Sequence, residues 1–497
     1  MAKNLVIRAD AGPEIGTGHV MRCLALAQVW QDDGGDVTFL TATDVPALEE
    51  RLQSEGTSVL RLTASPGSID DALETADLAQ KNNSAWVVAD GYHFGSEYQR
   101  LIKNSGLKLL CVDDYGHSDH YYADIVLNQN ISARRDRYPG REAYTELLLG
   151  TDYALLRREF LEMCSREREV PDTARKILIS LGGSDSRNAT LKAVRALKTI
   201  DLCCSEVLIL VGSSNKNRDS LDKELSSALF RFSLLTASND MPALVRWADM
   251  AISAGGSTCW ELAYLGVPSI ILVIADNQEP VAEGLDRAGA VLSLGRSHEI
   301  SESRIAEEFK MLARDREKRR EMARIGRKLV DGIGASRVLA CMKETIALRE
   351  ASWADCELLF HWANDPDIRA ASFRPDPISL EEHEQWLKSK LKAAGCFFYV
   401  AVDGAGVPIG QVRYDMTGGE MVISVSVDKA FRSKGYGSRI IRKGCEKVRG
   451  VTQVGSIHAY VKEGNTVSLS TFIKAGFEET ALSSVQGRRA RHFIMRT

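Results

Sequence analysis

Residues 249–273 read DMAISAGGSTCWELAYLGVPSIILV. Two short apolar runs, MAISA and PSIILV, enclose a Gly-rich turn and an apolar stretch of helical length. A strand, a tight turn, a helix and a second strand in this order are typical of a parallel sheet with helices on its faces. The stretch therefore predicts an α/β fold in which the turn lies at the carboxyl end of a strand.

Apolar runs alternate with amphipathic stretches over the whole region before residue 350. One series comprises LVIRA, DVTFLTA, SVLRL, AWVVAD, LKLLCVDD and ADIVLN, and a second comprises RKILIS, EVLILV, FSLLTAS, DMAISA and PSIILV. Each series suits a doubly wound parallel sheet. We expect two Rossmann-like domains, over residues 1–155 and 156–349.

The pattern changes after residue 350. The runs FFYVAVDG, PIGQVRYD and MVISVSVD indicate antiparallel strands, and a helix after Gly435 and the strand SIHAYV follow them. These elements predict a separate α+β domain over residues 350–497, which is an ordinary domain length.

The composition bounds the partners of the protein. The chain has 497 residues, with 63 Lys and Arg against 67 Asp and Glu, so its formal net charge is -4. No global positive field exists to hold nucleic acid or an anionic membrane, and we expect neither as a partner. Arg8 and Asp10 interrupt the N-terminal apolar run, and SIILVIA is too short to span a bilayer. We expect a cytoplasmic protein, and the sequence leaves its oligomeric state open.

The ten cysteines and nine histidines show no metal-ligand spacing. Cys203 and Cys204 are adjacent, and neither a CxxC nor an HExxH motif occurs. We therefore expect chemistry without a bound metal ion.

The first chemical motif lies in RADAGPEIGTGHVMRCLALA, where Gly16, Thr17 and Gly18 precede His19 at the start of a helix. Glycines let the backbone approach a ligand, and the free N–H groups and dipole of the helix favour an anion such as a diphosphate. The alternative is that the turn only connects a strand to a helix and that His19 is a structural or capping histidine.

The second motif is the turn inside residues 249–273. Ser257 and Thr258 begin a helix, and Glu261 follows Ser257 by four residues on the same helical face. A carboxylate placed there can accept the hydroxyls of a ribose while the turn holds phosphates. In the alternative interpretation, Glu261 is a solvated or ion-paired helix residue. Asn277 and Gln278 follow the next strand and favour the nucleotide site.

Several segments, in this order, resemble the UDP-sugar hydrolase family of pseudaminic acid biosynthesis, which is similar in fold to the GT-B glycosyltransferases. They are RADAGPEIGTGHVMRCLALA, VADGYHF, CVDDYGH, ADIVLNQN, ISLGGSD and SAGGSTCWELAYLGVPSI with DNQ, and they span residues 5–280. The resemblance implies a GT-B-like pair of Rossmann-like domains. It also implies removal of UDP from UDP-2,4-diacetamido-2,4,6-trideoxy-β-L-altropyranose by attack of water at the anomeric carbon, without a metal.

The same resemblance implies roles for individual residues. His19 would be the water-activating base, Tyr92 and Asn277 would line the sugar site, and Glu261 would hold UDP. The other substrate-binding residues implied are Gly16, Thr17, Gly18, Gly183, Ser257, Thr258 and Gln278. These roles agree with the chemistry of the side chains, because a neutral imidazole can accept a proton from water and the leaving diphosphate needs hydrogen-bond donors more than an acid. Asp10, Asp113 and Asp114 at strand ends are expected to act behind the site.

The third motif is VSVDKAFRSKGYGSRII, in which a strand precedes a cationic, Gly-rich loop and a helix. Backbone N–H groups and two cations there can cradle a pyrophosphate. The pattern resembles the acetyl-CoA loop of the GNAT N-acetyltransferases, over about residues 351–497. It implies acetyl-CoA as co-substrate, bound by Val427, Arg432, Lys434, Gly435, Tyr436, Gly437 and, in the later segment YVKEGNTVSLSTFIKAGF, by Asn465.

Three positions in this domain carry separate expectations. His383 is a candidate for the acceptor site, and the alternative is a surface histidine of an amphipathic helix. Phe472 stands where many members place a tyrosine that protonates the departing thiolate, so solvent or Tyr460 would have to serve. Val422 stands where relatives often carry Glu, and this leaves the base for the amine unassigned.

Together the two resemblances imply consecutive reactions on UDP-linked amino sugars. Acetylation of the 4-amino group of UDP-4-amino-4,6-dideoxy-N-acetyl-β-L-altrosamine would precede hydrolysis of the diacetamido product. Two alternatives remain open: a GT-B glycosyltransferase fused to an acetyltransferase, and a nucleotide-sugar-binding protein with an inert GNAT domain.

Overall fold

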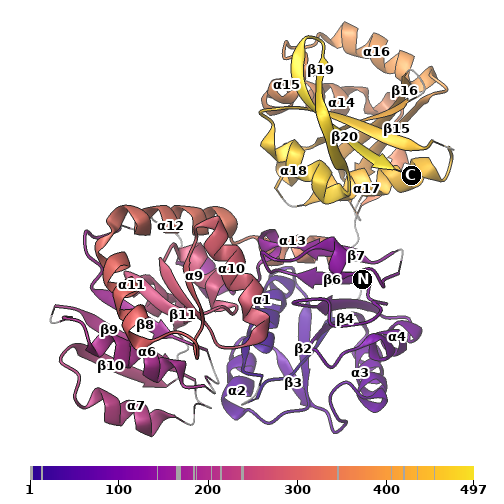
Figure 1. The fold of residues 1–497 in the computed structure, drawn as a ribbon. Helices are drawn as coiled ribbons and strands as arrows, with labels where there is room; N and C mark the ends of the chain where they lie inside the picture. The colour runs from indigo at the N-terminus through magenta and orange to yellow at the C-terminus, as the bar shows by residue number, and fades with distance from the viewer. Residues whose placement is uncertain are drawn as a thin grey trace. The chain divides into compact units, whose positions relative to one another are not determined.

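The computed structural model of the chain describes residues 4–12, 15–142, 144–163, 169–182, 185, 187–202, 204–212, 215, 217–236, 240–343, 346–403, 406–417, 420–433, 435–452 and 454–496. The chain forms two compact units, Met1–Met342 and Lys343–Thr497 (Figure 1). The first unit contains two parallel sheets and the second a mixed sheet, so the expected α/β class with a following α+β domain is confirmed.

The first half of the first unit is built on a seven-stranded parallel sheet in the order β3-β2-β1-β4-β5-β6-β7. Its strands are β1 (Asn4–Ala9), β2 (Asp36–Thr41), β3 (Ser58–Arg61), β4 (Ser84–Asp90), β5 (Lys108–Val112), β6 (Ile125–Asn128) and β7 (Glu146–Leu149), and its helices include α1 (Gly18–Asp32), α2 (Pro46–Ser54), α3 (Ile69–Lys81) and α4 (Ser96–Asn104). The central strands are almost wholly buried because helices cover both faces of the sheet, which is why they are continuous apolar runs in the sequence.

The second half repeats this architecture around a six-stranded parallel sheet in the order β10-β9-β8-β11-β12-β13. The strands are β8 (Lys176–Ser180), β9 (Glu206–Val211), β10 (Arg231–Thr236), β11 (Met250–Ala254), β12 (Ser269–Val273) and β13 (Leu292–Arg296), and the helices are α6 (Ala189–Lys198), α7 (Arg218–Leu225), α8 (Met241–Trp247), α9 (Thr258–Leu265), α10 (Glu279–Ala288), α11 (Glu302–Arg314) and α12 (Arg316–Leu329). Strands β7 and β13, each at an edge of its sheet, were not among the predicted runs.

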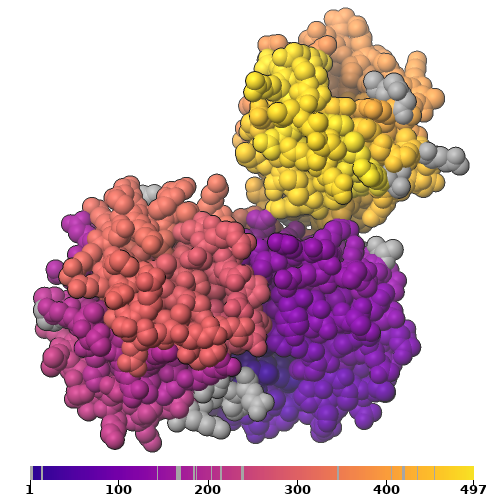
Figure 2. Space-filling view, viewed as in Figure 1, coloured from indigo at the N-terminus to yellow at the C-terminus, as the bar shows by residue number. Residues whose placement is uncertain are grey.

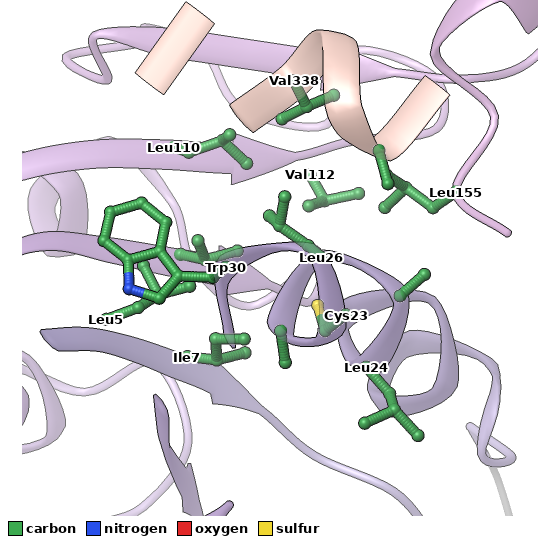
Figure 3. Close-up of a cluster of buried hydrophobic side chains, with 14 of the residues drawn as sticks. Leu5, Ile7, Cys23, Leu24, Leu26, Trp30, Leu110, Val112, Leu155 and Val338 are labelled. Atoms are coloured by element: carbon green, nitrogen blue, oxygen red, sulfur yellow. The ribbon is translucent and has the colours of Figure 1, made fainter. Parts of the chain in front are cut away.

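The two halves of the first unit are in direct contact (Figure 2). Gly284 of α10 lies so close to Ile131 that a Cβ on the glycine would be 2.5 Å from the Ile131 side chain. The last helix of the unit, α13 (Gly334–Met342), returns to the first half. There Val338 joins a buried cluster with Trp30 of α1 and Leu110 of β5 (Figure 3). The sequence-based boundary at residue 155 therefore separates the two sheets, whereas α13 belongs by its packing to the first half.

The second unit holds a seven-stranded sheet in the order β14-β15-β16-β17-β18-β20-β19, in which β17 and β18 are parallel and the other neighbours antiparallel. The strands are β14 (Ala347–Glu350), β15 (Cys396–Val402), β16 (Pro408–Thr417), β17 (Glu420–Val427), β18 (Ser456–Lys462), β19 (Glu478–Val485) and β20 (Arg488–Arg496), and the helices are α14 (Cys356–Ala363), α15 (Pro366–Ala371), α16 (Leu380–Lys392), α17 (Tyr436–Arg449) and α18 (Thr466–Ala475). Because β14 pairs with β15, residues 347–350 belong to this unit and not to the preceding domain.

The sheet of the second unit has two differently covered faces. Helices α17 and α18 pack on one face around Met421, Ile457 and Phe493, and α14 and α16 pack on the other face over β15. The two last strands were not predicted, because β19 is mostly exposed and lacks the apolar alternation of a half-buried strand. None of the described helices is long and apolar enough to cross a bilayer.

Candidate functional site

The GTGH motif follows the carboxyl end of β1, at the edge where parallel strands place ligand sites. Gly12 and Gly16 exchange two backbone hydrogen bonds, of 3.1 and 2.7 Å, and Gly16 has φ +72°, a conformation that glycine adopts readily. Thr17 is the N-cap residue of α1 but makes no side-chain capping bond. The tight turn thus directs the first turn of α1, with His19, toward the second half.

His19, which is partly buried, pairs with the buried Asp90, the last residue of β4. The distance between His19 Nδ1 and Asp90 Oδ1 is 2.6 Å, and Arg22 donates to both Asp90 oxygens, at 2.6 and 2.7 Å. Burial alone would raise the pKa of Asp90, but the charge of Arg22 and the hydrogen bonds hold it well below its usual range. Asp90 is therefore ionised and keeps the hydrogen of His19 on Nδ1, which leaves Nε2 as the proton acceptor.

Arg22 extends this cluster to a second carboxylate. It donates to Asp114 at 2.8 and 3.1 Å, and Tyr92 donates its hydroxyl to the same carboxylate at 2.7 Å. Burial and the Asp114 charge raise the pKa of Tyr92 well above its usual range, so its hydroxyl stays protonated. The Tyr92 oxygen accepts from Asn277 Nδ2 at 2.9 Å, so two residues predicted for the sugar site meet across the two halves.

The turn between β11 and α9 faces the GTGH loop. A Cβ on Gly18 would lie 3.8 Å from Ser257 Oγ, so the first turn of α1 and the start of α9 approach each other. Ser257 is the N-cap residue of α9 without a side-chain capping bond, and Thr258 is its first residue. Gln278 lies behind the turn, because a Cβ on Gly255 would be 2.9 Å from the Gln278 carbonyl oxygen. Two helix N-termini and the Ser257 hydroxyl therefore lie close together, which suits a diphosphate.

Glu261 is ion-paired in the structure. Its Oε1 accepts from Arg157 at 2.9 Å, and Arg157 also pairs with Glu159 at 3.0 Å. Burial raises the pKa of Glu261, although Arg157 opposes the shift. Ribose binding by Glu261 stays a prediction, and it would have to use the oxygen that Arg157 does not occupy.

Two residues of this cluster, Arg22 and Asp90, are not predicted by the sequence motifs. Arg22 lies three residues after His19 and so on the same face of α1, and Asp90 ends a predicted strand; both signals are visible but weak. Asp113 accepts from the N–H groups of Tyr115 and Gly116 at 2.6 Å and so fixes the turn after β5, and its role behind the site stays a prediction. Asp114, in contrast, lies within the cluster. Gly183 is outside the described residues, and among the described residues no group of three or more His, Cys, Asp or Glu side chains is arranged so that it could hold a metal ion.

In the second unit, the predicted phosphate loop joins β17 to α17. Gly435 is the N-cap residue of α17 with φ +81°, and a Cβ on Gly437 would lie 3.0 Å from Thr471 Cγ2 of α18. Arg432 donates to the carbonyl of Val427 at 3.0 Å and to Asp365 and Asp367 at 2.8 Å each. Its guanidinium therefore braces the loop against α15. Tyr436 is the first residue of α17, and Lys434 is outside the described residues.

Strands β17 and β18 separate next to this loop. They are described in full, and their register pairs are Met421 with Ile457 and Val422 with His458, so pairing stops after two residues. Asn465 lies beyond the end of β18, where it caps α18 by accepting from the N–H of Ser468 at 3.1 Å. The unpaired parts of β17 and β18 and the start of α17 all lie toward the carboxyl ends of these strands, as a coenzyme site requires. We call the region between the unpaired parts the opening.

His383 differs from both of its interpretations. It is 1% exposed and packs between Phe360 and Trp386, with ring centroids 5.6 and 5.4 Å away. Its helix α16 buries His383 and Leu387, which are four residues apart and share a face. The structure thus places His383 in the core and not in an acceptor site. Phe472 is likewise a core residue, packed against Phe477 at 5.2 Å.

Comparisons with known proteins agree with this division. Residues 177–333 match the glycosyltransferase family 28 C-terminal domain, and residues 345–478 match the acetyltransferase (GNAT) domain. The chain therefore combines a region similar to a glycosyltransferase C-terminal domain with a region similar to a GNAT acetyltransferase domain. It is 24% identical to the uncharacterized protein MJ1062 of Methanocaldococcus jannaschii, over 96% of this chain and 97% of that protein.

Two further relatives match the first unit. The spore coat polysaccharide biosynthesis protein SpsG of Bacillus subtilis is 25% identical over 68% of this chain and 97% of its own length. The UDP-2,4-diacetamido-2,4,6-trideoxy-beta-L-altropyranose hydrolase of Campylobacter jejuni is 25% identical over 57% of this chain and 97% of its own length. The chain is homologous to both, which confirms the resemblance noted in the sequence.

Proposed function

We propose that the first unit hydrolyses a UDP-linked diacetamido sugar and releases UDP, with His19 as the base. The observation that carries the proposal is the His19–Asp90 pair at the N-terminus of α1, opposite the start of α9. The match to a hydrolase of this substrate class over most of that enzyme's length supports it.

The cluster around His19 suits proton abstraction from water. Water would give its proton to His19 Nε2 as its oxygen bonds to the anomeric carbon, and the bond from that carbon to the phosphate oxygen would break with its electron pair leaving on UDP. Asp90 and Asp114 carry two negative charges against the one positive charge of Arg22. Asp90 holds the ring through Nδ1 so that Nε2 can accept the proton, and Arg22 holds Asp90 in place.

The departing diphosphate would be stabilised by donors rather than by an acid. The first turns of α1 and α9 and the Ser257 hydroxyl lie close together, and Thr17 and Thr258 at the starts of these helices would add two more hydroxyl donors. Donors held in place before the reaction stabilise the charge that develops on the leaving oxygen.

Hydrolysis in ¹⁸O-labelled water tests this proposal. We expect UDP release without any added acceptor and UDP free of the label, because water attacks carbon and not phosphorus. Label in the UDP would mean cleavage at phosphorus and would contradict the mechanism. The glycosyltransferase domain match of residues 177–333 favours sugar transfer as a second candidate, and UDP release that depends on an added hydroxyl acceptor would support it.

We infer that the second unit transfers the acetyl group of acetyl-CoA to the 4-amino group of the same sugar nucleotide before hydrolysis. The N-terminus of α17 behind Gly435 would hold the pyrophosphate, and the separation of β17 from β18 would admit the thioester arm. Mass spectrometry of a reaction with the UDP-4-amino sugar and acetyl-CoA tests the order. We expect the acetylated nucleotide sugar to accumulate before UDP is released. Release of UDP from the sugar nucleotide that still carries its free amine would contradict this order.

A further inference from the structure

Four hydrogen-bonded side chains cross strands β18, β20 and β19 in the second unit. Ser456 Oγ lies 2.8 Å from His458 Nε2, His458 Nδ1 lies 3.0 Å from His492 Nε2, and His492 Nδ1 lies 2.9 Å from Thr480 Oγ1. We call these four residues the histidine chain. Each neutral imidazole has one donor and one acceptor nitrogen, so all hydrogen bonds of the chain can form with the donors pointing in either of two directions. A change from one direction to the other moves a proton along the chain.

The histidine chain lies on the sheet face that α17 and α18 do not cover. Ile457, Ala459 and Val461 of β18 are buried in the cluster with those helices, so His458 and Tyr460 point to the opposite face. His492 is the register partner of Tyr460, and their rings stack at 4.7 Å with an interplanar angle of 12°. Two imidazoles and a phenol are therefore grouped on one face.

This group lies where β17 and β18 separate. His458 forms the last register pair of the two strands, with Val422, and Tyr460 lies two residues further, beside the opening. Under the acetyltransferase function proposed above, the thioester enters that opening. The histidine chain is then next to the thioester carbonyl carbon that an amine must attack. Its residue His458 pairs with Val422, which stands where relatives often carry Glu.

The charged groups around His458 and His492 suit a proton acceptor. The groups that face it are Glu420 of β17, whose Oε2 lies 3.8 Å from His458 Nδ1, and the phenol of Tyr460. Burial lowers the pKa of His492, and His458 lowers it further, against the opposing charge of Glu420. His492 is therefore neutral near pH 7, and Glu420, with 52% of its side chain exposed, stabilises the cation once a proton arrives.

We propose that His458 and His492 together accept the proton that the acceptor ammonium must lose before acetyl transfer. The ammonium gives one proton to the pair, and the freed lone pair bonds to the thioester carbonyl carbon. The carbon–sulfur bond then breaks, and the nitrogen loses a second proton, which solvent carries to the coenzyme A thiolate. The pair returns its proton to water along the chain. This inference rests on the proposed acetyl transfer and names the base that the reaction needs.

The test compares acetyl transfer by the full-length protein and its variants across pH. His458→Gln and His492→Gln should lower kcat at pH 7 by about 10²-fold, with the KM for acetyl-CoA unchanged. The rate of either variant should rise with pH until the amine deprotonates by itself, whereas the wild type should reach its plateau earlier. Thr452→Val, which removes a hydroxyl bond to the Val448 carbonyl beyond the end of α17 and lies outside the histidine chain, should keep the wild-type profile.

The possible outcomes separate the two ideas. A pH profile of His492→Gln that matches the wild type would overturn the role of the pair. If the wild type ignores the UDP-4-amino sugar but acetylates another primary amine, the proposed substrate fails, and the same variants are compared on that amine. Equal rates of the variants and the wild type on that amine would overturn the role of His458 and His492 as the base. The absence of acetyl transfer to any amine would overturn both proposals.

Discussion

His19 Nδ1 and Asp90 Oδ1 lie 2.6 Å apart although 71 residues separate them in the chain. One residue lies in the first turn of α1 and the other ends β4, and β1 and β4 are adjacent in the sheet. Parallel neighbours end at the same edge of a sheet, which is why a helix that follows β1 meets the carboxylate that ends β4.

His19→Asn and Asp90→Asn should each lower kcat of UDP-sugar hydrolysis by about 10²- to 10⁴-fold, because one removes the base and the other its orientation. UDP binding measured by calorimetry should stay near wild type, and so should acetyl transfer. The double variant should be no slower than the slower single variant, since both act on one step. Asp77→Asn, at an exposed pair with Lys81, is the control. Hydrolysis by His19→Asn at the wild-type rate would remove His19 from the reaction.

Tyr92→Phe should raise the KM for the sugar nucleotide by about tenfold while UDP affinity is unchanged. The variant loses a hydroxyl that contacts both Asp114 and Asn277, and a hydrogen bond to a charged group contributes about 1.5–3 kcal/mol. Tyr144→Phe loses a surface bond to the Tyr122 carbonyl and should have no effect. Equal weakening of UDP itself would place Tyr92 at the nucleotide rather than at the sugar.

Glu261→Ala should weaken UDP binding by about 1.5–3 kcal/mol if the carboxylate accepts ribose hydroxyls. Glu159→Ala is the matched control, because it removes the other carboxylate of Arg157 and leaves Glu261 in place. Calorimetry with UDP distinguishes the two. Similar losses in both variants would assign the effect to Arg157, and no loss in either would leave Glu261 as an ion-paired helix residue.

Gly435→Glu should abolish acetyl-CoA binding and spare hydrolysis of the diacetylated sugar nucleotide. The change places a side chain and a negative charge at the N-terminus of α17, at a residue with φ +81°. Gly455→Glu adds the same charge to the same unit at a position where a Cβ meets nothing within 4 Å, and it should bind acetyl-CoA normally. Unchanged binding by Gly435→Glu would place the coenzyme elsewhere.

Arg22→Met should lower the free energy of unfolding at pH 7 by about 3–5 kcal/mol, because it leaves buried carboxylates without a counter-charge. In the wild type, Arg22 helps to lower the pKa values of Asp90 and Asp114 below their unfolded values. That stabilisation is present above about pH 4 and is lost as the pH falls through the folded-state values. Denaturation at several pH values should show the difference between variant and wild type shrinking below about pH 4. A difference that does not depend on pH would mean that Arg22 acts through packing.

Local patterns predicted most of the fold because each signal lies within a few residues. The central strands are continuous apolar runs since helices bury both faces of parallel sheets, and the glycines of GTGH and GGST mark turns at strand ends. Strands β13 and β19 lack such runs, because part of their surface meets solvent, and β7 is an apolar run of only four residues. His383 was misplaced because an apolar helix face tolerates a histidine without any local sign of burial.

Short-range sequence thus accounts for the two Rossmann-like halves, the following domain that matches the GNAT acetyltransferases, and the position of His19 at the start of a helix beside a Gly-rich turn. Contacts between side chains from distant segments could not be predicted from such local patterns. That Asp90 and Arg22 complete the His19 cluster, that Tyr92 meets Asn277, and that His458 and His492 share one face all depend on which strands are neighbours and in what register. Register follows from the packing of whole sheets against their helices, a sum over many weak contacts that no single motif encodes.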